Sequence, residues 1–181
     1  MKEISLHILD ILQNSITAGA TLVELGINEN KEKDLFAFYI KDNGKGMDEE
    51  FLKNVTSPFT TKRTTRKVGL GIPLLKMAAE NTGGGIDIKS KVGEGTVITA
   101  TFSYNHIDRQ PLGNIVDTVF TVITSYTETD FLYIHTVGEK EFELDTRQMK
   151  DILGGVPLND AGVMEWLLGY LKEGEEELNA G

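Results

Sequence analysis

Asp42, Gly44, Gly46 and Met47 have types and a spacing that suit recognition of a flat ring bearing an amine. The apolar run 35–40 before them predicts a largely buried strand, so Asp42 stands at a strand end where it can face inward. A carboxylate only accepts hydrogen bonds, and glycines let main chain approach a ring closely. Adenine carries such an amine. Because Asp-x-Gly-x-Gly is also ordinary turn chemistry, a simple turn stays open as the alternative.

A second set of polar residues lies on a predicted helix at 2–18, which is apolar around most of its circumference. Its one polar stripe follows spacings of three and four residues and therefore occupies a single face. The stripe consists of Glu3, His7, Asp10, Asn14 and Thr17. Such a stripe either lines a cleft or is the solvent side of an amphipathic helix, and the helix by itself favours neither.

The segment 57–67 carries four cations among hydroxyl residues. It is either a flap able to close on polyphosphate or a solvated run of charge. A helix is predicted directly after it, at 73–81, because proline suits a first helical turn and glycines follow the last one. Gly69, Leu70 and Gly71 then lie at a helix N-terminus, where free amides attract phosphate, and this favours the flap.

The remaining elements of the N-terminal part predict a layered fold. Apolar runs bounded by turn residues indicate two hairpins, and Asp48 is a plausible N-cap for a short helix to about residue 55. The predicted strands are 21–27, 35–41, 86–89 and 96–104. Helices on one face of a largely antiparallel sheet make a two-layer α/β sandwich of the α+β class.

Composition limits the class of protein. At 181 residues with 40% hydrophobic content, the chain fits one domain, or one domain with an appendix. It has no cysteine and three scattered histidines, which argues against a disulfide framework and against a thiolate or histidine metal cluster. No apolar run is long enough to span a bilayer and the first residues do not resemble a secretory signal, so we expect a cytoplasmic protein without a membrane partner.

The net charge of -10 comes entirely from the C-terminal part, since residues 1–105 carry 13 acidic and 13 basic side chains and residues 106–181 carry 15 and 5. Nucleic acid is therefore an unsuitable partner, and a basic or apolar protein surface suits the chain better. This part predicts a helix from residue 111, a hairpin at 131–145 and two more helices, with an acidic tail at 173–177 that we expect to fray. It would form a small lobe on the rest, or supply a partner or homodimer surface.

Four ordered stretches resemble the motifs of the GHKL superfamily of ATP-binding domains, which includes DNA gyrase B, the large heat-shock chaperone ATPases, histidine kinases and MutL mismatch-repair proteins. Residues 10–20 look like the N box in a spelling close to the MutL form, and 42–47 and 69–72 look like the two glycine boxes. Residues 93–96 resemble the last glycine-threonine element, and 58–62 are spelled much as in the ATP lid of histidine kinases. The resemblance implies the Bergerat fold, with an ATP-binding domain at 1–105 and an appendix at 106–181.

The resemblance also implies roles for individual residues. Asn14 would hold Mg²⁺ through its amide oxygen, and Asp42 would bind the adenine amine with Thr96 beneath it as support. The implied ATP-binding residues are Asn14, Asp42, Gly44, Gly46, Met47, Thr60, Thr61, Lys62, Gly69, Leu70, Gly71, Ile72 and Thr96. Asp10 stands where hydrolysing relatives have a glutamate general base, and because aspartate is one methylene shorter, hydrolysis is in doubt.

Two hypotheses for the function follow from this resemblance. In the first, the chain is a histidine-kinase-like ATPase domain that phosphorylates a separate protein in trans, since we expect no phosphoacceptor helix before its N box. In the second, it is an ATP-operated binding module with little or no turnover. The kinase-like spelling at 58–62 favours the first and Asp10 favours the second. Residues 106–181 are short and acidic for the second domain that gyrase and MutL place after the ATPase.

Overall fold

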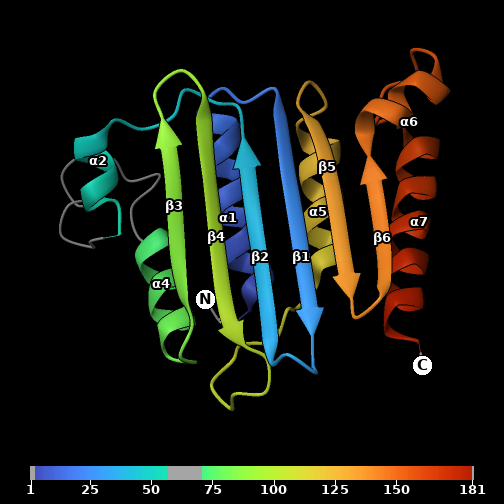
Figure 1. Ribbon diagram of the computed structural model, residues 1–181. Coiled ribbons are helices and arrows are strands. Elements are labelled where there is room, and N and C mark those ends of the chain that lie inside the picture. Colours follow the sequence, from blue (N-terminus) through green and yellow to red (C-terminus); the bar gives the residue numbers. More distant parts are fainter. Residues whose placement is uncertain (1–2, 57–70, 181) are drawn as a thin grey trace.

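The computed structural model describes residues 3–56 and 71–180. Its centre is a six-stranded sheet in the order β3-β4-β2-β1-β5-β6 (Figure 1). The strands are β1 (Leu22–Asn30), β2 (Leu35–Asp42), β3 (Gly85–Lys91), β4 (Gly95–Ser103), β5 (Asp130–Val137) and β6 (Lys140–Asp145). All neighbours are antiparallel except β1 and β5, which run parallel.

The helices form the second layer, as expected of a two-layer α+β sandwich. They are α1 (Ile4–Thr17), α2 (Glu49–Asn54), α4 (Gly71–Glu80), α5 (Ile115–Ser125), α6 (Thr146–Leu153) and α7 (Ala161–Asn179). Figure 1 shows α1, α4 and α5 against one face of the sheet, with α7 beside β6 at its far edge. No helix in the described ranges is long and apolar enough to cross a membrane.

The core lies between α1 and the central strands. Side chains on β2 alternate between buried and partly exposed, with Phe36, Phe38 and Ile40 turned toward the helices. Ile8 and Leu12 of α1 are fully buried and belong to the same apolar cluster. This packing fixes the position of α1 on the sheet. The distance between the polar stripe of α1 and the end of β2 is therefore fixed as well.

Residues beyond 105 continue the same sheet and do not build a sheet of their own. β5 pairs in parallel with β1, from Leu22 opposite Asp130 to Glu29 opposite Val137. The connection before α5 is also tied to the start of α1, because the Ile4 amide donates to the Pro111 carbonyl at 2.9 Å. The boundary that we place at residue 105 from the motifs stays a prediction.

The acidic tail is helical to its end, so our expectation that residues 173–177 fray is wrong. Glu175 is only 8% exposed and accepts hydrogen bonds from Tyr133 Oη at 2.8 Å and from His135 Nδ1 at 2.8 Å. Gly174 lets this turn of α7 approach closely, since a Cβ there would lie 2.2 Å from the Phe142 ring. The two hydrogen bonds to the buried Glu175 carboxylate stabilise this last part of α7, although its neighbouring glutamates repel one another.

Candidate functional site

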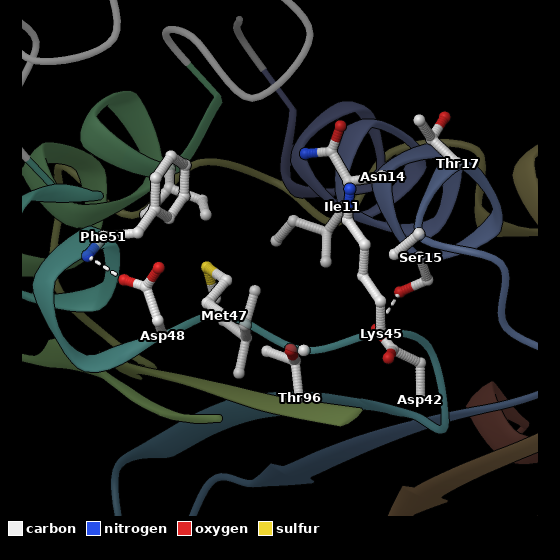
Figure 2. A pocket seen from close by; sticks show the side chains of 14 residues that line it. Ile11, Asn14, Ser15, Thr17, Asp42, Lys45, Met47, Asp48, Phe51 and Thr96 are labelled. Carbon is white, nitrogen blue, oxygen red and sulfur yellow. Dashed lines mark hydrogen bonds between the residues drawn. The ribbon is translucent and has the colours of Figure 1, made fainter. Parts of the chain in front are cut away.

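A cavity of about 380 Å³ opens between α1, the loop after β2, α2 and β4. Figure 2 shows Phe51, Met47 and Ile11 around the same hollow as Asn14 and Asp42. The lining residues are Ile11, Asn14, Ser15, Thr17, Ala18, Asp42, Lys45, Gly46, Met47, Asp48, Phe51, Ile72, Thr96 and Ile98. A mostly apolar wall with a few polar groups suits a small ligand with a flat ring.

Asp42 presents its carboxylate at the base of this cavity. Its Oδ2 accepts a hydrogen bond from Ser15 Oγ at 2.6 Å, and its Oδ1 accepts one from the Gly44 amide at 2.9 Å. An ionised carboxylate has about four acceptor positions, so two bonds fix its plane and leave capacity for a ligand amine. The local structure therefore orients Asp42 as an acceptor.

Thr96 lies directly opposite Asp42 in the pairing of β2 with β4, but its hydroxyl hydrogen-bonds Ser90 Oγ at 2.8 Å. We expected Thr96 to support Asp42. The side chain that holds the Asp42 carboxylate is instead Ser15, one residue after Asn14 on α1. Thr96 lines the cavity, and Ser90 Oγ behind it also accepts from the Met47 amide at 2.8 Å.

The loop after β2 is held by hydrogen bonds to its neighbours on both sides, so its main chain forms a rigid wall of the cavity. At the start of β1, Asn43 Oδ1 accepts from the amides of Thr21 at 2.8 Å and Leu22 at 3.0 Å. Toward the β3–β4 turn, the Lys45 carbonyl accepts from the Gly93 amide at 2.8 Å. These bonds hold the main chain of the loop in one position beside the cavity.

The loop needs a glycine at position 46. Its φ is +75°, and a Cβ there would lie 2.1 Å from the Lys91 carbonyl oxygen. Any side chain would combine an unfavourable backbone conformation with a clash against main chain. Gly46 therefore lets the loop after β2 lie in contact with the end of β3 at Lys91.

The polar stripe of α1 divides between cavity and interior. Asn14 and Thr17 line the cavity, whereas His7 is buried with its Nε2 3.0 Å from Gln110 Oε1. Burial lowers the pKa of His7, which the Gln110 hydrogen bond only partly opposes.

Asp10 is partly buried and is not a lining residue, and burial raises the pKa of its carboxyl. Within the described residues, Asp10 Oδ2 and Asn14 Nδ2 have no hydrogen-bond partner.

Asp10 lies against the first residue of α4. A Cβ at Gly71 would be 1.7 Å from Asp10 Oδ2. The Asp10 carboxylate of α1 is therefore in contact with the Gly71 main chain at the start of α4. The amino end of a helix favours a negative charge. The N box and the second glycine box are thereby joined through one contact.

We expect Gly71→Ala to destabilise the protein by roughly 1–3 kcal/mol, because the added methyl group must displace the Asp10 carboxylate or α4. In an Asp10→Ala background the same change should cost much less. Denaturant unfolding of the four variants gives the coupling directly. Gly169→Ala is the matched control, since it is also helical and its Cβ would meet nothing within 4 Å. A Gly71→Ala protein as stable as Gly169→Ala would refute the contact.

The structure brings most of the predicted site together. The predicted residues that line the cavity are Asn14, Asp42, Gly46, Met47, Ile72 and Thr96. Gly44, Gly71 and Asp10 adjoin it through the contacts given above. The predicted phosphate-binding residues Thr60, Thr61, Lys62, Gly69 and Leu70 lie outside the described residues and stay predictions.

Several contributors were missed from the sequence. Ser15 follows Asn14 directly, but a small polar residue on a buried helix gives no sign of its partner 27 positions away. Lys45, the one basic side chain among the described lining residues, stands between the two glycines and could have been noted there. The sequence pattern places Phe51 only in a short helix, although an aromatic residue beside a ring-binding loop is a recognisable signal.

Comparison with known families and proteins agrees with the geometry. Residues 2–106 match the family described as Histidine kinase-, DNA gyrase B-, and HSP90-like ATPase. Sensor histidine kinase YvrG of Bacillus subtilis is 31% identical over 97 residues, covering 51% of this chain and 17% of that protein. Sensor protein SrrB of Staphylococcus aureus is 39% identical over 79 residues, covering 41% of this chain and 13% of that protein. The matched stretch thus spans less than a fifth of either relative.

Solved structures with this fold include the N-terminal domain of a DNA repair protein, with a TM-score of 0.54 at 14% identity over 80% of this chain and 53% of that one. The MutL ATPase domain of Aquifex aeolicus complexed with ADP gives a TM-score of 0.53 at 16% identity, covering 85% of this chain and 70% of that one. At such identities the likeness shows the fold alone. The family match covers more than half of the chain and confirms the resemblance seen in its motifs: this protein belongs to the histidine kinase-, DNA gyrase B- and HSP90-like ATPase family.

Proposed function

We propose that the cavity binds ATP, with the adenine ring against the apolar wall and its amine donating to Asp42. The observation that carries this proposal is the Asp42 carboxylate, oriented by Ser15 and Gly44 and open on the side of the cavity. Membership of an ATPase family and the likeness to a MutL domain complexed with ADP support it. The fixed loop wall gives the ring a surface that is already formed.

We propose further that Mg²⁺ enters with the nucleotide and is bound by Asn14. No cluster of three or more histidine, cysteine or acidic side chains in the described ranges could hold a metal ion alone. Magnesium commonly takes one or two protein oxygens and completes its shell with phosphate and water. Asn14 fits that use, because it lines the cavity and carries an amide oxygen, a hard ligand that suits Mg²⁺. When bound, the ion would neutralise phosphate charge.

Transfer of the γ-phosphoryl group to a separate protein is the activity that we propose for the bound nucleotide. It is supported by the sequence similarity to two sensor proteins, one of them a histidine kinase, together with the kinase-like spelling at 58–62. Incubation with γ-labelled ATP, Mg²⁺ and candidate partner proteins tests it. Acid-labile label on a partner would indicate phosphohistidine, and acid-stable label would indicate a hydroxyl acceptor. Absence of label on every partner, with ATP bound, would contradict transfer.

The second candidate is an ATP-operated binding module with little turnover, and one observation favours it. Asp10 stands where the motif resemblance places a general base, yet it does not line the cavity. A base must come within hydrogen-bond reach of the group that it deprotonates. In this case nucleotide would change which partner surface the protein presents, and no label would leave ATP.

Variants of Asn14 and Asp10 should behave differently. Asn14→Ala should weaken Mg-ATP binding about tenfold, because a magnesium ligand is lost. Asp10→Asn should leave binding within about twofold, since its carboxylate does not line the cavity. Asp10→Glu should raise any slow phosphate release by restoring the reach of the usual base. Calorimetry and a phosphate-release assay measure these effects, and equal losses of binding in Asn14→Ala and Asp10→Asn would contradict the assignment.

A further inference from the structure

One face of α7 carries two aromatic side chains followed by two glutamates. Trp166, Tyr170, Glu173 and Glu177 succeed each other at spacings of four, three and four residues, which places them in one line along the helix. Trp166 is 54% exposed and Tyr170 is 39% exposed, and both glutamates are exposed. We call these four residues the α7 stripe. At the rise of an α-helix the stripe is about 16 Å long.

The aromatic half of the stripe is a flat and rigid platform. The Trp166 and Tyr170 rings stack with centroids 5.1 Å apart and planes 12° from parallel. Tyr170 packs in turn on Phe142 of β6, with centroids 5.3 Å apart. Leu167 and Leu171, on an adjoining side of α7, are fully buried, so the helix cannot rotate to hide the platform. Large exposed aromatics on a fixed element are a usual sign of a binding surface.

The acidic half of the stripe offers two exposed carboxylates to a partner. In the described residues, neither Glu173 nor Glu177 forms a side-chain hydrogen bond or ion pair. Of the five basic side chains at 106–181, Lys172 is exposed on α7 and forms no ion pair with Glu173 or Glu177 in the described residues, and the other four have partners elsewhere. Lys140 donates to the Glu177 and Ala180 carbonyls, Arg147 pairs with Asp145, Lys150 pairs with Asp130, and Arg109 donates to the Tyr104 carbonyl.

We propose that the α7 stripe docks an arginine-containing segment of another protein. Arginine suits both the aromatic half and the acidic half of the stripe, because its guanidinium group stacks on aromatic faces and also pairs with carboxylates. An extended segment of about five residues would span the stripe. A second copy of this chain has no arginine in its own stripe, and nucleic acid or an anionic membrane would be repelled by the two glutamates. The charge of the stripe therefore selects a cationic protein partner.

The test uses the full chain and its single tryptophan, Trp166, whose fluorescence reports directly on the platform. The probes are short peptides of alternating arginine and alanine, and the same peptides with lysine in place of arginine. We expect the arginine peptide to change Trp166 emission and to bind several-fold more tightly than the lysine peptide, because only guanidinium stacks well. Tyr170→Ala should remove that preference while keeping the reporter. An unchanged Trp166 signal with both peptides overturns the proposal.

Charge variants separate this site from general attraction to an acidic protein. Glu173→Gln with Glu177→Gln should weaken the arginine peptide about tenfold at low salt. Glu32→Gln with Glu80→Gln removes the same charge from exposed positions elsewhere and should change affinity less than about twofold. Equal weakening in both pairs overturns the proposal. Self-association in sedimentation that Tyr170→Ala abolishes would also overturn it, because the stripe would then bind a second copy.

Discussion

The Asp42→Asn variant is expected to fold normally and to bind ATP at least about 100-fold more weakly than the parent protein. Asparagine can keep both local contacts, since its oxygen can still accept from the Gly44 amide and its nitrogen can donate to the Ser15 hydroxyl. The side that faces the ligand then presents a donor to the adenine amine, which is also a donor. Calorimetric titration with Mg-ATP measures the loss, and circular dichroism checks the fold.

Asp48→Asn is the matched control for this experiment. Asp48 also lines the cavity, but its carboxylate caps α2 by accepting from the Phe51 amide at 2.7 Å. Asparagine is an equally good N-cap, so stability and ATP affinity should change little. Unchanged ATP affinity in a folded Asp42→Asn protein would contradict the assignment of adenine to Asp42.

Glu175→Ala is expected to lower the free energy of unfolding by roughly 2–5 kcal/mol. The change removes the carboxylate that accepts from Tyr133 Oη and His135 Nδ1, and His135 is only 1% exposed. Two buried donors would then lack their acceptor. Glu176→Ala, at an exposed neighbouring position, is the control and should cost less than about 0.5 kcal/mol. Equal stability of the two variants in denaturant unfolding would show that the buried cluster does not hold α7.

The cluster of Glu175, Tyr133 and His135 should make the free energy of unfolding fall as pH rises above neutrality. Burial alone would lower the pKa of His135, but hydrogen bonds from its ring to Glu175 and Glu29 raise it to about 9. Because the folded pKa lies above the unfolded value of 6.5, this stabilisation is complete below pH 6.5 and is lost as pH rises through about 9. The full effect is about 3 kcal/mol. Tyr133, whose pKa burial and Glu175 raise well above its usual value, acts in the same direction at higher pH.

Denaturant unfolding at several pH values measures this dependence. In His135→Gln the loss between pH 6.5 and about pH 9 should be absent, because no proton is released there on unfolding. A parent protein whose stability is constant across this window, or rises through it, would contradict the charged state of His135.

The sequence was sufficient for the layers and for much of the site, because local signals specify both. Alternating and continuous apolar runs predict the strands, and Asp48 caps its helix as expected. Asp42 and Gly46 could be identified because a carboxylate at a strand end and a glycine at positive φ are both local properties. The polar stripe of α1 predicts the cavity position of Asn14, although it does not reveal that His7 faces the interior.

The rest depends on contacts between distant residues. Nothing in the run 130–137 shows that it pairs in parallel with β1, since the partner of a strand is chosen by packing and not by its own pattern. The burial of Glu175 is invisible in an acidic tail until His135 and Tyr133 are placed beside it. Ser15 is similar, because its role exists only when α1 crosses the end of β2.

Titration of the protein with ATP and with inosine triphosphate tests the central claim most directly. The two nucleotides share ribose, triphosphate and magnesium, and they differ where the adenine amine is replaced by a carbonyl oxygen. If Asp42 binds that amine, ATP should bind with one-to-one stoichiometry and inosine triphosphate should bind at least about 100-fold more weakly, since two acceptors would face each other. Equal affinity for both nucleotides, or no binding of either, would contradict the account of this site.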